Sequence, residues 1–122
     1  MTEYSDSDEV DFSEQTKEGE DNTIFVGMKP FMNYVTGVIV QFNTNNATEV
    51  IIKSRGKFIS KAVDIAEIAK RKFLKDKNIV VKEVKIGSEE FENKEGRMVN
   101  VSVMEIVLKR GSLVRNLPVS GP

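Results

Sequence analysis

A chain of 122 residues with a formal net charge of −1 provides one ordinary domain and little room for a second. It contains no cysteine and no histidine, which excludes disulfide frameworks, thiolate metal sites and most of the familiar catalytic constellations. Since the sequence has no run of about 18 apolar residues, and its first residues are acidic rather than basic and then apolar, we expect neither a membrane span nor an export signal.

The charge is divided unevenly along the chain. Residues 1–21 contain nine acidic residues and a single lysine, a net charge of −8, whereas residues 22–122 carry 17 Lys and Arg against 10 Asp and Glu, a net charge of +7. The acidic segment has few apolar residues and no sustained periodicity, so it cannot bury enough surface to offset the entropy cost of ordering it. We predict a disordered acidic N-terminal tail (1–21), a basic domain (22–110) and a C-terminal tail (111–122) that can include vector-derived residues.

The basic domain is predicted to begin with a strand and a helix joined by the sequence GMKP. The run from Thr23 to Val26 is β-branched and aromatic, and Gly27 stops it. Pro30 suits the first turn of a helix, and apolar residues then recur at helical spacing as far as Phe42. Lys29 therefore lies just before a helix N-terminus, where free N–H groups and the helix dipole favour a phosphate.

A second strand and a second helix repeat this arrangement. Glu49 to Ser54 is predicted to be a strand, Arg55-Gly56-Lys57 a turn, and Ile59 to Phe73 a helix with one apolar stripe. Crossovers of one hand place successive loops at one edge of a sheet, so we expect both helix entrances to share a basic edge. Gly56 allows a close approach of the backbone to a sugar-phosphate strand, Arg55 offers two donors to one phosphate, and Lys57 adds a point charge.

The last elements are predicted to form a long hairpin with a charged tip. Val80 to Phe91 and Met98 to Lys109 are the two strands, and the loop between them contains Gly96, which suits a left-handed turn position. We expect the base of the hairpin to be buried and its tip to project. Because a projecting arm is costly without a partner, we expect an interface there, either with another subunit or with a ligand.

The elements together predict an α+β two-layer sandwich of order β-α-β-α-β-β, with a four-stranded mixed sheet and two helices on one face. Over residues 22–110 the chain resembles the Alba family of archaeal chromatin proteins, most closely in GMKPFMNYV, EVIIKSRGKFISKAVDIAEI, KEVKIGSEE and VSVMEI. The resemblance implies a fold similar to the C-terminal domain of translation initiation factor three. It also implies a non-enzymatic homodimer, chromosome-associated in the cytoplasm, that coats double-stranded DNA with little sequence preference and also binds RNA.

A basic face is expected to track the phosphates while the hairpin tips enter a minor groove. Two positions depart from the family pattern. Met28 stands where the family usually has a reversibly acetylated lysine, so the resemblance does not carry acetylation control to that position; Asn100 stands where a second arginine is frequent, so the arm should grip more weakly. The predicted nucleic-acid-binding residues are Lys29, Asn33, Lys53, Arg55, Gly56, Lys57, Lys61, Lys94, Arg97 and Asn100.

Other residues allow competing interpretations. The basic residues of 70–77 complement a helix C-terminus and are interpreted as a solvated face. Phe73 is either a packing residue or, as the resemblance implies, a contact between dimers along DNA. The glutamates of 89–92 alternate in direction along a strand, so we expect no metal site, and no cofactor, small-molecule substrate or membrane partner either.

Two other functions compete with a DNA coat. The first is an RNA-binding module acting on structured RNA, because the main candidate stacking platform, Tyr34, lies on an apolar helical stripe. The second is a nuclease that uses carboxylate-bound metal. A cleavage assay with Mg²⁺ is expected to be blank.

The acidic tail generates a prediction about affinity. A charge of −8 tethered to a domain of +7 competes with phosphates at high effective concentration. Deleting residues 1–21 should therefore tighten binding to duplex DNA at low salt and steepen the salt dependence of the binding constant, measured by fluorescence anisotropy. An unchanged affinity would leave the tail with a solubilising role alone.

Overall fold

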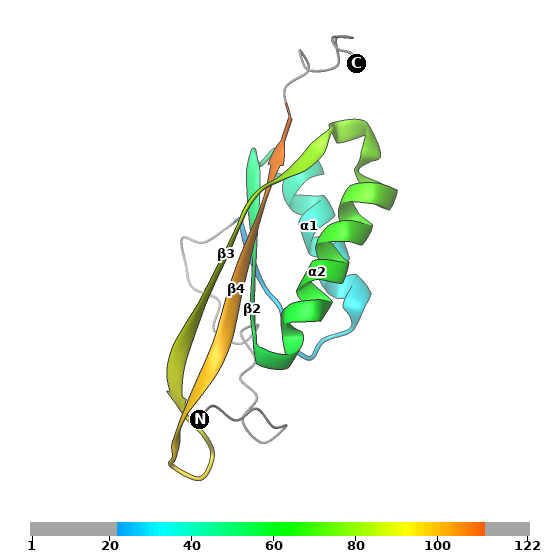
Figure 1. Ribbon diagram of the computed structural model, residues 1–122. Helices are drawn as coiled ribbons and strands as arrows, with labels where there is room; N and C mark the ends of the chain where they lie inside the picture. Colours follow the sequence, from blue (N-terminus) through cyan, green and yellow to red (C-terminus); the bar gives the residue numbers. More distant parts are fainter. Residues whose placement is uncertain (1–21, 112–122) are drawn as a thin grey trace.

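The computed structural model describes residues 22–111, which form a two-layer α+β sandwich (Figure 1). The predicted order of elements is confirmed. The predicted N-terminal tail and all but the first residue of the predicted C-terminal tail lie outside the described residues. The main elements are β1 (Thr23–Phe25), α1 (Phe31–Asn43), β2 (Glu49–Arg55), α2 (Ile59–Ile68), β3 (Ile79–Glu92) and β4 (Met98–Arg110).

The second helical segment is continuous from Gly56 to Phe73 but changes from 3-10 to α and then to π geometry. A 3-10 turn, η3 (Gly56–Phe58), leads into α2, and the π-helical turn η4 (Ala69–Phe73) continues it. The N–H of Leu74 donates to the carbonyl of Ala69 at 2.9 Å, which closes the wider turn. A further 3-10 turn, η5 (Lys75–Lys77), then leads to β3. None of the helices within residues 22–111 is long and apolar enough to cross a membrane.

The sheet is mixed, as predicted, with the strand order β1-β2-β4-β3. β1 pairs with β2 in parallel, whereas β4 pairs antiparallel with both β2 and β3. The register places Ile52 opposite Ile106 and Val50 opposite Leu108. Because side chains alternate along a strand, these four residues share the face that the helices cover (Figure 1).

The core lies between the two helices and strands β1, β2 and β4. Complete burial of one of its aliphatic side chains contributes about 1.5–3 kcal/mol. The close approach of α1 to β1 depends on Gly37, since a Cβ at that position would stand 3.2 Å from the Cδ1 of Ile24. The residues buried without any exposed surface include Val26, Val35, Val38, Phe42, Val50, Ile52, Ala62, Ile65, Ala69 and Leu108.

The hairpin base is buried along β4 but on β3 only at its first residue, Ile79. Ile106, Val107 and Leu108 of β4 are buried as predicted. The prediction is wrong for β3, where Val84 is 50% exposed and Ile86 is 77% exposed. β3 is an edge strand, and beyond Ile79, which packs into the core, its apolar residues on the helix side are left uncovered. The tip of the β3–β4 hairpin, residues 89–97, forms an arm. This arm extends past the end of the sheet where α1 and α2 begin (Figure 1).

An ion pair at the other end of the sheet ties β3 to β2 across β4. The Nζ of Lys82 lies 2.8 Å from the Oε2 of Glu49, beside a bulge between Val81 and Glu83. This hydrogen bond lowers the pKa of Glu49 and raises the pKa of Lys82. Because the pKa of Glu49 is lower in the folded than in the unfolded chain, the pair stabilises the fold at neutral pH. That contribution disappears as the pH falls through the folded pKa.

Glu49→Gln should therefore lower the urea midpoint of unfolding at pH 7, and it should lower it less at about pH 3, because protonation of Glu49 weakens the ion pair of the wild type at acidic pH. Glu95→Gln, the same change in the exposed tip of the arm, provides the matched control and should alter neither midpoint. A midpoint difference for Glu49→Gln that is as large at the acidic pH as at neutral pH would contradict the assignment.

Candidate nucleic-acid interface

The loop that carries Lys29 is held by two side chains. The hydroxyl of Tyr34 accepts the N–H of Gly27 at 2.9 Å and the N–H of Lys29 at 3.0 Å. The Nζ of Lys61 donates to the carbonyl of Gly27 at 2.7 Å and to that of Lys29 at 2.8 Å. The backbone N–H and carbonyl of both Gly27 and Lys29 are thus hydrogen-bonded, so the backbone of the loop is fixed at both ends.

This loop presents Lys29 beside the start of α1. Lys29 and Pro30 are exposed, and no side chain caps the helix. The N–H of Asn33 donates back to the carbonyl of Pro30 at 3.0 Å, whereas the N–H groups of Phe31 and Met32 precede the first helical carbonyl partner. An anion in front of α1 would meet these two donors, the positive end of the helix dipole and the Lys29 ammonium.

The second helix entrance lies against the first. Lys61 belongs to the first turn of α2, so its bonds to the Lys29 loop join the two entrances directly. The structure therefore brings both entrances together, as the sequence predicted. Gly56 has a φ of 52°, a left-handed conformation, and a Cβ there would stand 3.5 Å from Val101 of β4. Lys57, the next residue, is exposed.

Arg55 does not present an exposed fork of donors, and that part of the prediction is wrong. Its side chain is 9% exposed, and its guanidinium lies 3.8 Å from the centre of the Phe91 ring. Its NH2 group lies 3.4 Å from the Oε1 of Glu89. Burial lowers the pKa of Arg55, and Glu89 partly offsets that effect. Arg55 joins the end of β2 to the arm.

Two further predicted lysines also have partners within the fold. Lys61 is half-buried, with its ammonium over the Tyr34 ring at 5.1 Å. Lys53 lies on the sheet face opposite the helices, where its Nζ is 3.8 Å from Glu105 and 5.5 Å from the centre of the Phe25 ring. Lys53 is therefore separated from the helix entrances by the sheet.

The tip of the arm is an ordered loop. The Oδ1 of Asn93 accepts the N–H groups of Glu95 at 3.0 Å and Arg97 at 2.9 Å, and the N–H of Asn93 donates to the carbonyl of Arg97. Lys94 and Arg97 are exposed, as is Asn100. Within residues 89–97, however, four glutamates outnumber these two cations. The tip is therefore less favourable for phosphates than its two cations alone indicate.

Phe73 lies at the far end of the second helical segment from the Lys29 loop (Figure 1). Its side chain is 48% exposed, so the interpretation of Phe73 as a packing residue is wrong. Its alternative role, a contact between dimers, stays a prediction. The basic residues that flank it at positions 71, 72, 75 and 77 are exposed, as the solvated-face interpretation requires.

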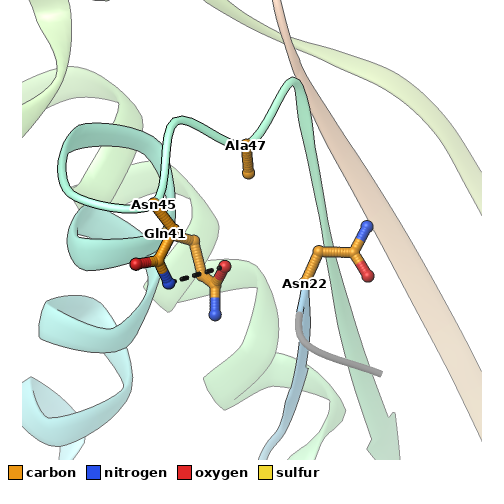
Figure 2. A pocket seen from close by; sticks show the side chains of 4 residues that line it. All are labelled: Asn22, Gln41, Asn45 and Ala47. Atoms are coloured by element: carbon orange, nitrogen blue, oxygen red, sulfur yellow. Dashed lines mark hydrogen bonds between the residues drawn. The ribbon is translucent and has the colours of Figure 1, made fainter. Parts of the chain in front are cut away.

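Two shallow hollows flank α1. One, of about 250 Å³, lies between β1 and the start of α1 and includes Lys29 and Asn33 in its wall. The other, of about 480 Å³, lies at the end of α1, and Figure 2 shows its amides, with the Nδ2 of Asn45 bonded to the Oε1 of Gln41 at 3.4 Å. No charged side chain of the described residues lines the second hollow, so it lacks the counter-charge that a phosphate needs. Residues 22–111 also contain no group of three carboxylate side chains placed to hold a metal ion.

Comparison with known proteins assigns this arrangement to a family. The family model described as Alba matches residues 22–88. The DNA/RNA-binding protein Alba of Picrophilus torridus is 50% identical over 91 residues, covering 75% of this chain and 98% of the relative. The solved structure of Alba from Thermoplasma volcanium is 52% identical with a TM-score of 0.67, covering 73% of this chain and all of that one. ALBA1 from Trypanosoma brucei, at 23% identity, 75% coverage of this chain and 71% of that one, and a TM-score of 0.55, shares the fold.

The burial of Arg55 generates a prediction about the arm. Arg55→Met keeps most of the side-chain volume but removes the charge and its contacts with Phe91 and Glu89. We expect a loss of about 1–2 kcal/mol in the free energy of unfolding and faster amide exchange over residues 88–92. Arg97→Met, the same change at the exposed tip, should leave both unchanged. If Arg55→Met has wild-type stability and wild-type amide exchange, Arg55 does not stabilise the arm against β2.

Proposed function

Since the chain belongs to the Alba family, we propose that it binds double-stranded DNA without sequence preference and coats and compacts it as a homodimer. The observation that carries this proposal is the junction of the two helix entrances, which leaves Lys29 exposed beside the uncapped start of α1 and Lys57 exposed in η3 before α2. The names of the relatives, DNA/RNA-binding protein Alba, agree with it.

The edge formed by the two helix entrances carries groups that bind phosphates rather than bases. Ammonium groups and helix N–H donors bind phosphate oxygens, and such contacts position a protein on a duplex without reading its sequence. Arg55, the arginine that directly precedes the second helix entrance, is engaged with Glu89 and Phe91. Burial of the Arg55 guanidinium removes it as an exposed partner for guanine, which supports binding without sequence preference.

The arm makes a secondary contribution in this proposal. Lys94, Arg97 and Asn100 can reach a minor groove from an arm that projects beyond the helix entrances (Figure 1). The glutamates beside them repel the phosphates that flank the groove. Substitutions in the arm should therefore cost less affinity than substitutions at Lys29 or Lys57.

The homodimer is supported by an apolar strip on β3. Val84 and Ile86 pair with Ile106 and Met104 of β4, which places them on the helix side of the sheet. They are nevertheless exposed, since β3 lies beyond the helices. Burying such a strip stabilises a complex by about 25 cal/mol per Å² of apolar surface. A second copy of the chain, placed against the arm, is the occupant we propose.

RNA is the alternative partner, because the relatives' names include it. A single-stranded RNA would need exposed aromatic rings on which its bases stack. Tyr34 is buried and its hydroxyl is engaged by two backbone N–H groups, which argues against it as such a platform. Structured RNA, with its continuous phosphate backbone, fits the basic edge better. Competition between random-sequence duplex DNA and structured RNA for one protein sample separates the two partners.

The salt dependence of binding to random-sequence duplex tests the proposal. Contact with about 6–10 phosphates would reduce affinity by ~10³–10⁵ between about 50 and 200 mM salt. Lys29→Ala and Lys57→Ala should each weaken binding on every duplex sequence and reduce the slope of log K against log[salt] by about 1.

Lys72→Ala is the matched control for charge. Lys72 is an exposed lysine in η4, at the opposite end of the domain from Lys29, and its loss changes the net charge by the same amount. It should have little effect on either affinity or slope. If Lys72→Ala costs as much affinity as Lys29→Ala, binding follows overall charge and the proposed edge is not the site.

A further inference from the structure

The loop from Gly27 to Lys29 owes its conformation to two side chains from outside it. Four hydrogen bonds of 2.7–3.0 Å join the loop to Tyr34 on α1 and to Lys61 on α2. Two of these bonds end on the backbone of Lys29 itself. Lys29 is also the exposed cation next to the start of α1. The position of its ammonium is therefore tied to Tyr34 and Lys61.

Tyr34 contributes a buried oxygen rather than a ring for stacking. Its side chain is 5% exposed, and its hydroxyl accepts two backbone N–H groups that lie two residues apart in the chain. One oxygen thus holds the backbone N–H groups of Gly27 and Lys29 close to each other. Without that oxygen both N–H groups would lose their acceptor, which costs free energy unless the loop moves to reach water.

Lys61 acts from the other side of the loop. An ammonium has three donors, and two of them are engaged by the carbonyls of Gly27 and Lys29. The rings of Tyr34 and Phe58, at 5.1 and 5.8 Å, provide further stabilisation for its charge. Lys61 is half-buried in this arrangement, whereas Lys29 and Lys57 are exposed. Its geometry suits holding the loop better than gripping a phosphate.

We infer that Tyr34 and Lys61 are positioning residues that hold Lys29 where a phosphate meets the start of α1. The inference rests on the proposed function, since it assigns roles within the same edge. A lysine side chain is flexible, and ordering it on binding costs free energy. A rigid loop leaves only the side chain to be ordered, so the contact forms at lower cost.

Tyr34→Phe tests this without changing the charge of the protein. The ring remains, and only the oxygen that accepts the two N–H groups is removed. We expect affinity for random-sequence duplex DNA to fall by about 3- to 10-fold and the salt slope to decrease by up to about 1, as if a phosphate contact were lost. Tyr4→Phe, the same change in the acidic tail, should alter neither quantity.

A double-mutant cycle with Lys29→Ala then identifies the route of the effect. If Tyr34 acts through Lys29, Tyr34→Phe should cause no further loss in a chain that already carries Lys29→Ala. Losses that simply add would overturn the inference, as would wild-type affinity in Tyr34→Phe. If the single variant Lys29→Ala binds as tightly as the wild type, the proposed function is overturned instead. The two failures are therefore distinguishable.

Lys61→Arg provides a second variant that keeps the charge and the tyrosine. One ammonium nitrogen reaches both carbonyls, whereas a guanidinium spreads its donors across a plane. We expect a similar loss of affinity that disappears in the Lys29→Ala background. Wild-type affinity in Lys61→Arg would assign Lys61 a direct charge contact and overturn its positioning role. Amide shifts of Gly27 and Lys29 in folded samples of each variant report the loop directly, and unchanged shifts would overturn the mechanism.

Discussion

The hydrogen bonds between the Lys29 loop and the pair Tyr34 and Lys61 are the interaction on which this edge of the protein depends. They join the end of β1, the start of α1 and the first turn of α2 into one unit. Backbone N–H and carbonyl groups in a tight loop need hydrogen-bond partners when water is excluded. Here two side chains form hydrogen bonds with four such groups. The same bonds that stabilise the connection also hold the backbone of Lys29, whose side chain is exposed.

The cations of the basic domain are divided between the fold and its surface. Arg55 and Lys61 are largely withdrawn from solvent and engage a carboxylate, two carbonyls and aromatic rings, whereas Lys29 and Lys57 remain exposed. Buried cations lose hydration and need such partners, so they are poor candidates for simultaneous phosphate binding. In the proposed function, the affinity of this edge for a polyanion therefore depends on fewer side chains than its composition suggests, and on how rigidly those are placed.

Charge is also segregated along the chain and in space. The net charge of −1 conceals a segment of −8 before a domain of +7, and within that domain the arm from 89 to 97 carries more glutamates than cations. Nucleic acids respond to local potential rather than to net charge. The glutamates of the arm disfavour a phosphate backbone beside them, which is why the edge at the helix entrances is the site that we propose.

The sequence alone determined the order of elements, the mixed sheet and the two helices on one face, because apolar periodicity and the turn residues Gly27, Pro30, Gly56 and Gly96 are local signals. The family followed from the resemblance of motifs such as GMKPFMNYV. It also predicted that both helix entrances meet. Only the tertiary structure decided which cations are exposed, and that β3 keeps its apolar face uncovered. Arg55 and Lys57 are two residues apart in the chain, yet one packs on Phe91 and the other faces solvent. Such a difference arises from contacts between residues distant in sequence, which no local pattern records.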